Sequence, residues 1–341
     1  MVRGELAAVA AAQGGAFTRA QARAAGYTER QLRTLTRYGG PWVVVRRGVY
    51  AEREVWEQAE PYDGHARLRD LAAHLMMRTD HVLSHDSAAR LLRLPFFRPR
   101  LELSHVSRPG VGGSRTDHGV KHHLTRLRPA GLTEAAGVRV TDPARTAVDL
   151  AREHGRRTGL SACDSAMRMG ATREQLRGEL AMMAHWPGVA VARRCVEDAD
   201  AEAETVGESL MRGLLLAMGL GEPDTQFPVM TTRGLAWADV RIGCHLFEFD
   251  GRLKFLPETR NGVATRPAEE VVWDEKLRQD AVCAEGLGMS RVVWEDLLGG
   301  RVRLTEQRLR AEFEATARRY GTELPEHLAR FAEQVRRRRR R

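Results

Sequence analysis

Three carboxylates in the last third of the sequence fall where they can act together. Asp239 lies in the predicted strand Trp237–Ile242. The next predicted strand, Leu246–Asp250, carries Glu248 and Asp250 two positions apart, so both project from one face. If the two strands pair, Asp239 lies close to Glu248. Carboxylates gathered in this way repel one another unless a cation joins them, and hard oxygen ligands suit Mg²⁺ or Mn²⁺. The pattern predicts a metal site formed by these three residues.

Further groups extend the chemistry of this site. Glu208, on a predicted helix, is a candidate fourth carboxylate, and Lys254 and Lys276 are candidate ammonium groups. A metal ion with an ammonium beside it supplies what phosphodiester hydrolysis needs, namely a Lewis acid, an activated water and stabilisation of a developing oxyanion. One alternative is that the carboxylates are strand-end acids with surface partners. Another is that Lys276 pairs with Asp280 one helical turn later.

A group of arginines near the N-terminus is a candidate for binding DNA. Arg30, Arg33 and Arg37 recur at spacings of three and four, which places them on one face of a predicted helix. In a helix-turn-helix this face enters the major groove. Arg46 and Arg47 form the turn of the predicted hairpin that follows, within reach of the DNA backbone or minor groove. The alternative is a solvated basic face in an arginine-rich protein.

The overall charge agrees with a polyanionic partner. The net charge is +9, and only three of the 54 basic residues are lysines. Two of these three, Lys254 and Lys276, flank the acidic residues. The six arginines Arg336–Arg341 predict a disordered tail, because a run of like charges does not pack.

The cysteines, the apolar runs and the histidines mainly exclude classes of protein and kinds of site. The four cysteines are far apart and form no Cys-x-x-Cys, which favours reduced thiols over disulfides or a zinc site. No apolar run approaches the ~20 residues of a membrane span, and Glu5 interrupts the apolar N-terminal stretch. We therefore expect a cytoplasmic protein with no membrane association and no small-molecule cofactor. Six histidines of the middle region lack a metal-ligand spacing, and we interpret them as structural or surface residues: His81, His85, His105, His118, His122 and His123.

The sequence predicts an α+β protein with several domains. Four segments of the chain position the residues described above. Residues 1–55 have the order helix, helix, helix, hairpin of a winged helix-turn-helix, with Thr18 and Thr28 as N-caps. Residues 56–200 form an α+β middle domain, residues 201–300 have the order α-β-β-β-α-β, and residues 301–341 are a helical extension with the arginine tail.

The predicted helices are Gly4–Ala12, Arg19–Ala25, Glu29–Tyr38, Asp63–Arg78, Pro143–Ala151, Gly159–Met169, Thr172–Met183, Val189–Asp198, Val206–Met218, Ala268–Glu285, Leu304–Tyr320 and Pro325–Val335. The predicted strands are Trp42–Val45, Val49–Ala51, Leu101–His105, Val120–His123, Val138–Val140, Gln226–Val229, Trp237–Ile242, Leu246–Asp250 and Ser290–Trp294.

Two groups of motifs carry a resemblance to known families. The first joins the helix-turn-helix to the stretches Ser84-His-Asp-Ser-Ala-Ala89, Val140-Thr-Asp-Pro-Ala-Arg-Thr-Ala-Val-Asp-Leu150 and Cys163-Asp-Ser-Ala-Met-Arg168. It resembles the AbiEi family, the antitoxins and transcriptional autorepressors of type IV toxin–antitoxin systems. The second comprises Gly207-Glu-Ser-Leu-Met-Arg212, Gln226, Asp239, Phe247-Glu-Phe-Asp-Gly251, Lys254, Trp273-Asp-Glu-Lys-Leu-Arg-Gln-Asp280 and Val292-Val-Trp-Glu-Asp-Leu297. It is similar to the very-short-patch-repair endonuclease relatives within the PD-(D/E)XK nuclease superfamily.

The second resemblance implies roles for individual residues. Asp239 is the first motif acid and Glu248 the second, while Asp250 stands where the family has its lysine. Either Lys254 or Lys276 replaces that lysine, or Asp250 is a further metal ligand, or the domain is a catalytically silent DNA-binding relative.

Two functions follow from these expectations. One is a Mg²⁺-dependent DNA endonuclease, in phage defence or repair, that a winged helix directs to DNA. The other is an AbiEi-like antitoxin or repressor with a silent nuclease-fold domain and a nucleotidyltransferase-like toxin as partner.

Overall fold

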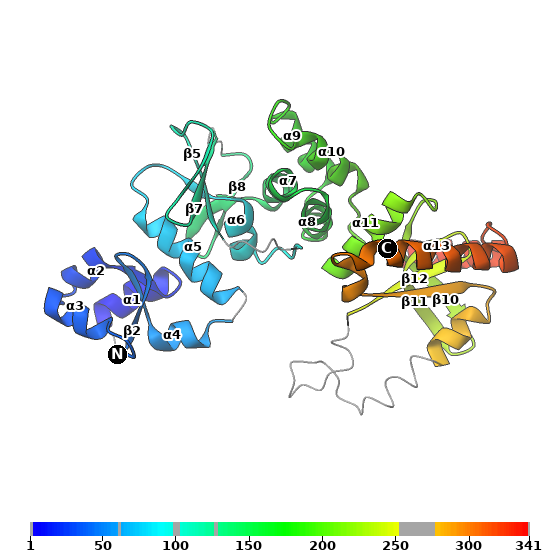
Figure 1. The fold of residues 1–341 in the computed structure, drawn as a ribbon, viewed down its shortest axis with the longest axis horizontal. Coiled ribbons are helices and arrows are strands. Elements are labelled where there is room, and N and C mark those ends of the chain that lie inside the picture. Colours follow the sequence, from blue (N-terminus) through cyan, green and yellow to red (C-terminus); the bar gives the residue numbers. More distant parts are fainter. Residues whose placement is uncertain (1–2, 61–62, 98–102, 126–128, 252–276, 340–341) are drawn as a thin grey trace. The chain divides into compact units, whose positions relative to one another are not determined.

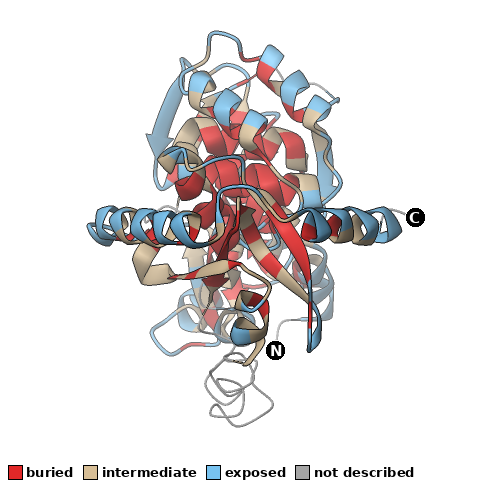
Figure 2. Cartoon of the chain, turned by 90° about the vertical axis from the view of Figure 1, so that its right-hand side faces the viewer, coloured by how far each residue is buried: buried red, intermediate tan, exposed pale blue. Residues whose placement is uncertain are grey.

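The computed structural model describes residues 3–60, 63–97, 103–125, 129–251 and 277–339. The chain is mixed α/β and divides into two compact units, Met1–Ala199 and Asp200–Arg341 (Figure 1). In both, buried residues gather along the strands and the inward faces of the helices (Figure 2). Within the described residues, no helix combines the length and the apolar character that crossing a membrane requires.

The first unit begins with three short helices and a three-stranded sheet. Capping boxes at Thr18 and Thr28 start the second and third helices, as the sequence predicts. The sheet has the antiparallel order β1-β3-β2, and Phe17, Trp42 and Tyr50 pack as an aromatic core beneath the helices. The elements are α1 (Gly4–Ala12), β1 (Ala16–Thr18), α2 (Arg19–Ala24), α3 (Glu29–Leu35), β2 (Trp42–Arg46) and β3 (Val49–Glu52).

The rest of the first unit is a six-stranded mixed sheet with helices packed against it. Its strand order is β6-β7-β5-β4-β9-β8, with parallel pairs β5–β7 and β4–β9. The strands are β4 (Val82–Leu83), β5 (Ser104–Arg108), β6 (Ser114–Asp117), β7 (Val120–Leu124), β8 (Leu132–Ala135) and β9 (Val138–Thr141). The helices are α4 (Arg53–Gln58), α5 (Gly64–Met76), α6 (His85–Leu92), α7 (Pro143–His154), α8 (Arg156–Arg168), α9 (Arg173–Ala181) and α10 (Val189–Asp198).

The second unit is built on a four-stranded sheet of order β10-β11-β12-β13. The first three strands form an antiparallel meander, whereas β13 runs parallel to β12, as a crossover connection requires. The elements are α11 (Val206–Met218), β10 (Asp224–Thr231), β11 (Gly234–Ile242), β12 (His245–Asp250), β13 (Gly288–Val293), the 3₁₀ helix η3 (Trp294–Leu297), α13 (Arg301–Tyr320) and α14 (Glu326–Arg339). Residues 277–283 are also helical; the rest of the helix predicted over Ala268–Glu285 lies mostly outside the described residues.

The arginine run at the end of the sequence is not a free tail over its described part. Arg336–Arg339 are the last residues of α14. Arg336 forms an ion pair with Asp224 and donates a hydrogen bond to the carbonyl oxygen of Thr225, 3.0 Å away, on β10. The expectation of a disordered tail is therefore wrong for these residues, because carboxylates compensate the charge: Asp224 pairs with Arg336, Glu333 with Arg337 and Glu202 with Arg339.

Candidate nucleic-acid interface and acidic site

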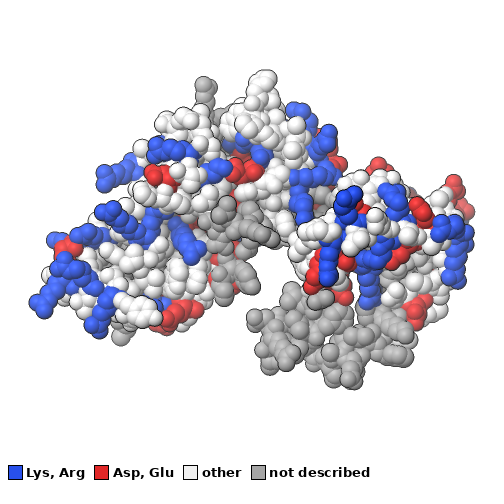
Figure 3. Space-filling view, in the orientation of Figure 1, with Lys and Arg blue, Asp and Glu red and all other residues white. Residues whose placement is uncertain are grey.

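Two arginines of α3 and one that follows the helix are exposed; because α3 ends at Leu35, the expectation that Arg37 lies on the helix face is wrong. The capping box at Thr28 orients the helix so that Leu32 is buried in the core while Arg30 and Arg33 are exposed; Arg37 is exposed just beyond the helix end. None of the three arginines makes an ion pair within the described part of the chain. Basic side chains are visible over this α2–α3 region at the lower left of Figure 3.

The neighbouring residues sharpen this contrast. Arg19 and Arg23 of α2 are neutralised by Glu29, at 2.6 and 2.7 Å. Tyr38, directly after the α3 arginines, is a fully exposed aromatic side chain. The free cations therefore lie on α3 and its C-terminal end, beside an aromatic ring that can stack on a base or pack against a sugar.

The two arginines at the β2–β3 turn differ from each other. Arg47 is exposed. Arg46 is half-buried, and its Nη2 donates a hydrogen bond to the carbonyl oxygen of His118, 2.8 Å away, in the turn between β6 and β7. Burial lowers the pKa of the Arg46 guanidinium. The sequence predicts both side chains as DNA contacts, but Arg46 is engaged with the six-stranded sheet, so Arg47 alone is presented to solvent.

Asp239 and Glu248 lie side by side in the sheet of the second unit. Val240 on β11 pairs with Phe247 on β12, so the adjacent positions along this antiparallel ladder bring Asp239 next to Glu248. The backbone N–H of Phe249 donates to Asp239 Oδ2 at 2.7 Å, consistent with this proximity. Asp250 is half-buried at the end of β12.

Glu248 forms an ion pair with Arg278, which is not among the site residues predicted from the sequence. Arg278 Nη2 contacts Glu248 Oε1 at 2.8 Å and Oε2 at 2.6 Å, and the glutamate side chain is only 10% exposed. Lys254 and Lys276 lie outside the described residues. A neutralised carboxylate is a poor Mg²⁺ ligand. Within the described residues, moreover, no set of three acidic groups in the second unit has its ligand atoms within 4.8 Å. The Mg²⁺ or Mn²⁺ site predicted at Asp239, Glu248 and Asp250 stays a prediction.

Glu208 stabilises the start of α11. It is the third residue of α11, and it accepts hydrogen bonds from the Glu204 N–H and the Thr205 hydroxyl, both at 2.9 Å. Gln226 Nε2 on β10 lies 3.4 Å from the same carboxylate. Burial raises the pKa of Glu208. The residue therefore fastens the start of α11 to β10, near the acidic strands but already bonded.

Histidines that are far apart in the sequence meet in the first unit. One ring nitrogen from each of His85, His105 and His123 lies within 4.8 Å of the others. Burial lowers the pKa of His105 to about 3 and that of His123 to about 4, and holds the pKa of His85 well below its usual value, so all three rings are neutral near pH 7. Sequence spacing gives no signal for this cluster, because its members come from α6, β5 and β7.

Comparison with known proteins adds no function. No protein-family model matches the chain. Two uncharacterized proteins of Mycobacterium tuberculosis, from strains CDC 1551 / Oshkosh and ATCC 25618 / H37Rv, are each 31% identical to it over 145 residues. The matches cover 40% of this chain and 52% of each relative, so the chain spans about half the length of the curated relatives it matches.

Proposed function

We propose that this chain is a DNA-binding protein of the repressor type, with a winged helix-turn-helix in residues 1–55 and a nuclease-fold domain in the second unit. The observation that carries the proposal is the exposed group of Arg30 and Arg33 on α3 with Arg37 just beyond it, which no carboxylate neutralises among the described residues. Three helices, two of them started by capping boxes, pack on a β1-β3-β2 sheet, and a winged helix-turn-helix uses such an arrangement to place its third helix in a major groove.

The arrangement of the acidic strands favours binding over cleavage. Arg278 neutralises the buried Glu248, and the Glu208 carboxylate already accepts a hydrogen bond from Thr205 at the start of α11. A nuclease-fold domain held in this state contributes surface and charge to DNA binding rather than a metal-activated water. The second unit is therefore interpreted as a silent relative of the PD-(D/E)XK nucleases.

The proposal is tested by the salt dependence of duplex binding. The full chain carrying Arg33→Ala and Arg37→Ala should bind a fluorescent duplex more weakly, and the slope of log Kd against log salt should fall by about 1.8, or ~0.9 for each lost phosphate contact. The control replaces two other exposed arginines of the same unit, Arg193 and Arg194, and so removes equal charge. If the two double variants behave alike, α3 is not the DNA-binding helix.

A second candidate function is a Mg²⁺-dependent endonuclease, which the adjacency of Asp239 and Glu248 favours. It requires Arg278 to leave Glu248 when DNA or metal binds. Plasmid DNA incubated with the full chain and Mg²⁺ or Mn²⁺ should then be nicked, and chelator or Glu248→Ala should abolish nicking. Intact plasmid under these conditions leaves the repressor function in place.

A further inference from the structure

Three elements of the six-stranded sheet region bring histidines to one point. His85 is the first residue of α6, His105 lies in β5, and His123 lies in β7, the parallel neighbour of β5. His105 Nδ1 is 3.0 Å from His123 Nε2, and the His85 and His123 rings stack with centroids 3.8 Å apart. His85 has a left-handed φ of +50°, a conformation that costs energy in a residue other than glycine.

Polar groups hold one nitrogen of His85 and of His105, while the stacked His85 and His123 rings must turn relative to each other to direct their lone pairs at one ion. Asp86 Oδ2 is 3.4 Å from His105 Nε2 and 2.7 Å from His154 Nε2, a position that favours the His105 tautomer with its proton on Nε2. In that tautomer His105 Nδ1 accepts the hydrogen bond from His123 Nε2, and a bound ion would replace the proton of this bond. Ser84 Oγ lies 2.9 Å from His85 Nδ1. Carboxylates and hydroxyls that hold the second nitrogen of an imidazole are the usual outer partners of metal-bound histidine.

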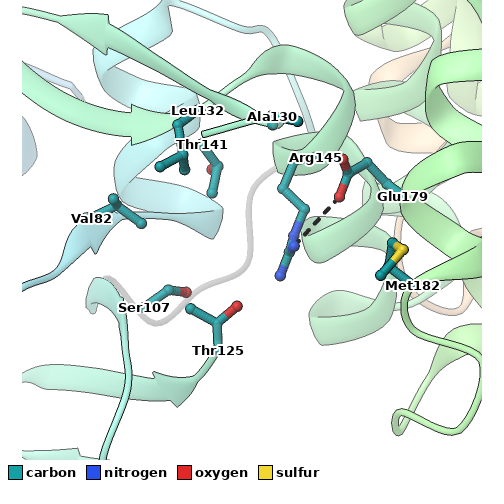
Figure 4. A pocket seen from close by; sticks show the side chains of 10 residues that line it. Val82, Ser107, Thr125, Ala130, Leu132, Thr141, Arg145, Glu179 and Met182 are labelled. Atoms are coloured by element: carbon teal, nitrogen blue, oxygen red, sulfur yellow. Dashed lines mark hydrogen bonds and ion pairs between the residues drawn. The ribbon is translucent and has the colours of Figure 1, made fainter. Parts of the chain in front are cut away.

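A cavity lies beside two of the three rings. His85 and His123 line a space of about 850 Å³, together with Lys121, Arg152 and Trp186. A smaller neighbouring hollow, drawn in Figure 4, shares Ser107, Thr125, Arg145 and Met182 with it; there Arg145 of α7 turns toward Glu179 of α9. An ion held by the three rings would lie at the wall of the larger space.

We propose that His85, His105 and His123 bind a transition-metal ion of the Zn²⁺ class, with an open fourth position toward the cavity. Imidazole nitrogens suit Zn²⁺, Co²⁺ or Ni²⁺, whereas Mg²⁺ prefers oxygen ligands. Two nitrogens ~2.0–2.1 Å from a tetrahedral zinc are ~3.3 Å apart, close to the 3.0 Å between His105 and His123. The site is independent of the DNA-binding proposal and of the acidic strands.

The test uses the full chain, stripped with chelator and titrated with Co²⁺ and Zn²⁺. One ion should bind per chain, and Co²⁺ should give visible d–d bands of a four-coordinate nitrogen site without thiolate charge transfer. His105→Gln and His123→Gln should each weaken binding by at least about 100-fold, beyond the usual loss from outer-partner changes. Helical circular dichroism checks that these variants fold.

Two matched variants separate this site from its rivals. His118→Asn removes an exposed imidazole from the turn before β7, at a left-handed φ that asparagine tolerates, and should leave Co²⁺ affinity unchanged. His154→Gln should weaken binding only modestly. Loss of the site in His154→Gln with retention in His123→Gln would assign the ion to Asp86, His105 and His154 instead and overturn the proposal. No visible bands in the wild type at millimolar Co²⁺ would overturn it regardless of how the variants fold.

Discussion

Replacing Arg278 with alanine removes the ion-pair partner of Glu248. The change leaves Glu248 ionised and nearly buried, with a side chain only 10% exposed. Removing one partner of a buried ion pair costs about 3–5 kcal/mol of unfolding free energy. Because the Arg278 side chain is 32% exposed, water screens part of this interaction, and we expect about 2–3 kcal/mol. At roughly 4 °C per kcal/mol for a domain of this size, the Tm of the second unit should fall by about 10 °C.

Thermal unfolding of the full chain, followed by calorimetry, measures the effect, and Arg330→Ala is the matched control. Arg330 pairs with Glu326 on α14, but both side chains are mostly exposed, so its loss should shift the Tm by less than about 2 °C. Adding Glu248→Gln to Arg278→Ala should recover part of the lost stability, because the uncompensated charge is gone. Equal Tm values for Arg278→Ala and Arg330→Ala would refute the buried-pair reasoning.

Two further predictions concern acid and the end of the chain. Burial lowers the pKa of His245 to about 4, so the stability that neutral His245 contributes is present above pH 6.5 and is lost as the pH falls toward 4, by up to ~1.4 kcal/mol per pH unit. The His245→Asn variant should therefore show a weaker dependence of the second unit's Tm on pH between 6.5 and 4. An unchanged slope of Tm against pH would contradict this. Arg336→Ala should lower the Tm of the second unit by several degrees, whereas Arg338→Ala, an exposed neighbour, should not; equal Tm values would show that the contact with Asp224 adds nothing.

Elements with local signals could be predicted, and those that depend on distant partners could not. Helices α2 and α3 carry capping boxes in their own sequence, and the amphipathic pattern of α11 gives its bounds. By contrast, β1 has three residues and exists because β3 pairs with it, and the two-residue strand β4 is held between β5 and β9. Strands this short have no periodicity to read. The sequence also predicts no element at α6, a helix of only eight residues that buries polar side chains such as Asp86 and Arg90 together with apolar ones.

The same distinction applies to the functional residues. The exposure of Arg30 and Arg33 follows from helix spacing, because Leu32 between them faces the core. The engagement of Arg46 by His118 joins positions 72 residues apart, and the Arg278–Glu248 pair joins positions 30 apart. No local pattern predicts either contact. For Arg336 the local pattern gives the wrong prediction. A run of arginines predicts disorder, but Arg336 forms an ion pair with Asp224 on the strand that it packs against.

The docking of α14 on β10 has a consequence for the order in which the second unit folds. Leu328 and Ala332 of α14 share a core with Phe227 of β10, and the Arg336–Asp224 contact closes a loop of 112 residues. Closing a loop of this length costs on the order of 4 kcal/mol of chain entropy, well above the cost for the adjacent hairpins of the meander. The meander is therefore expected to form first, with one face of β10 open until α14 arrives. During that interval the unit exposes apolar surface, which makes this late step the one most prone to aggregation on refolding.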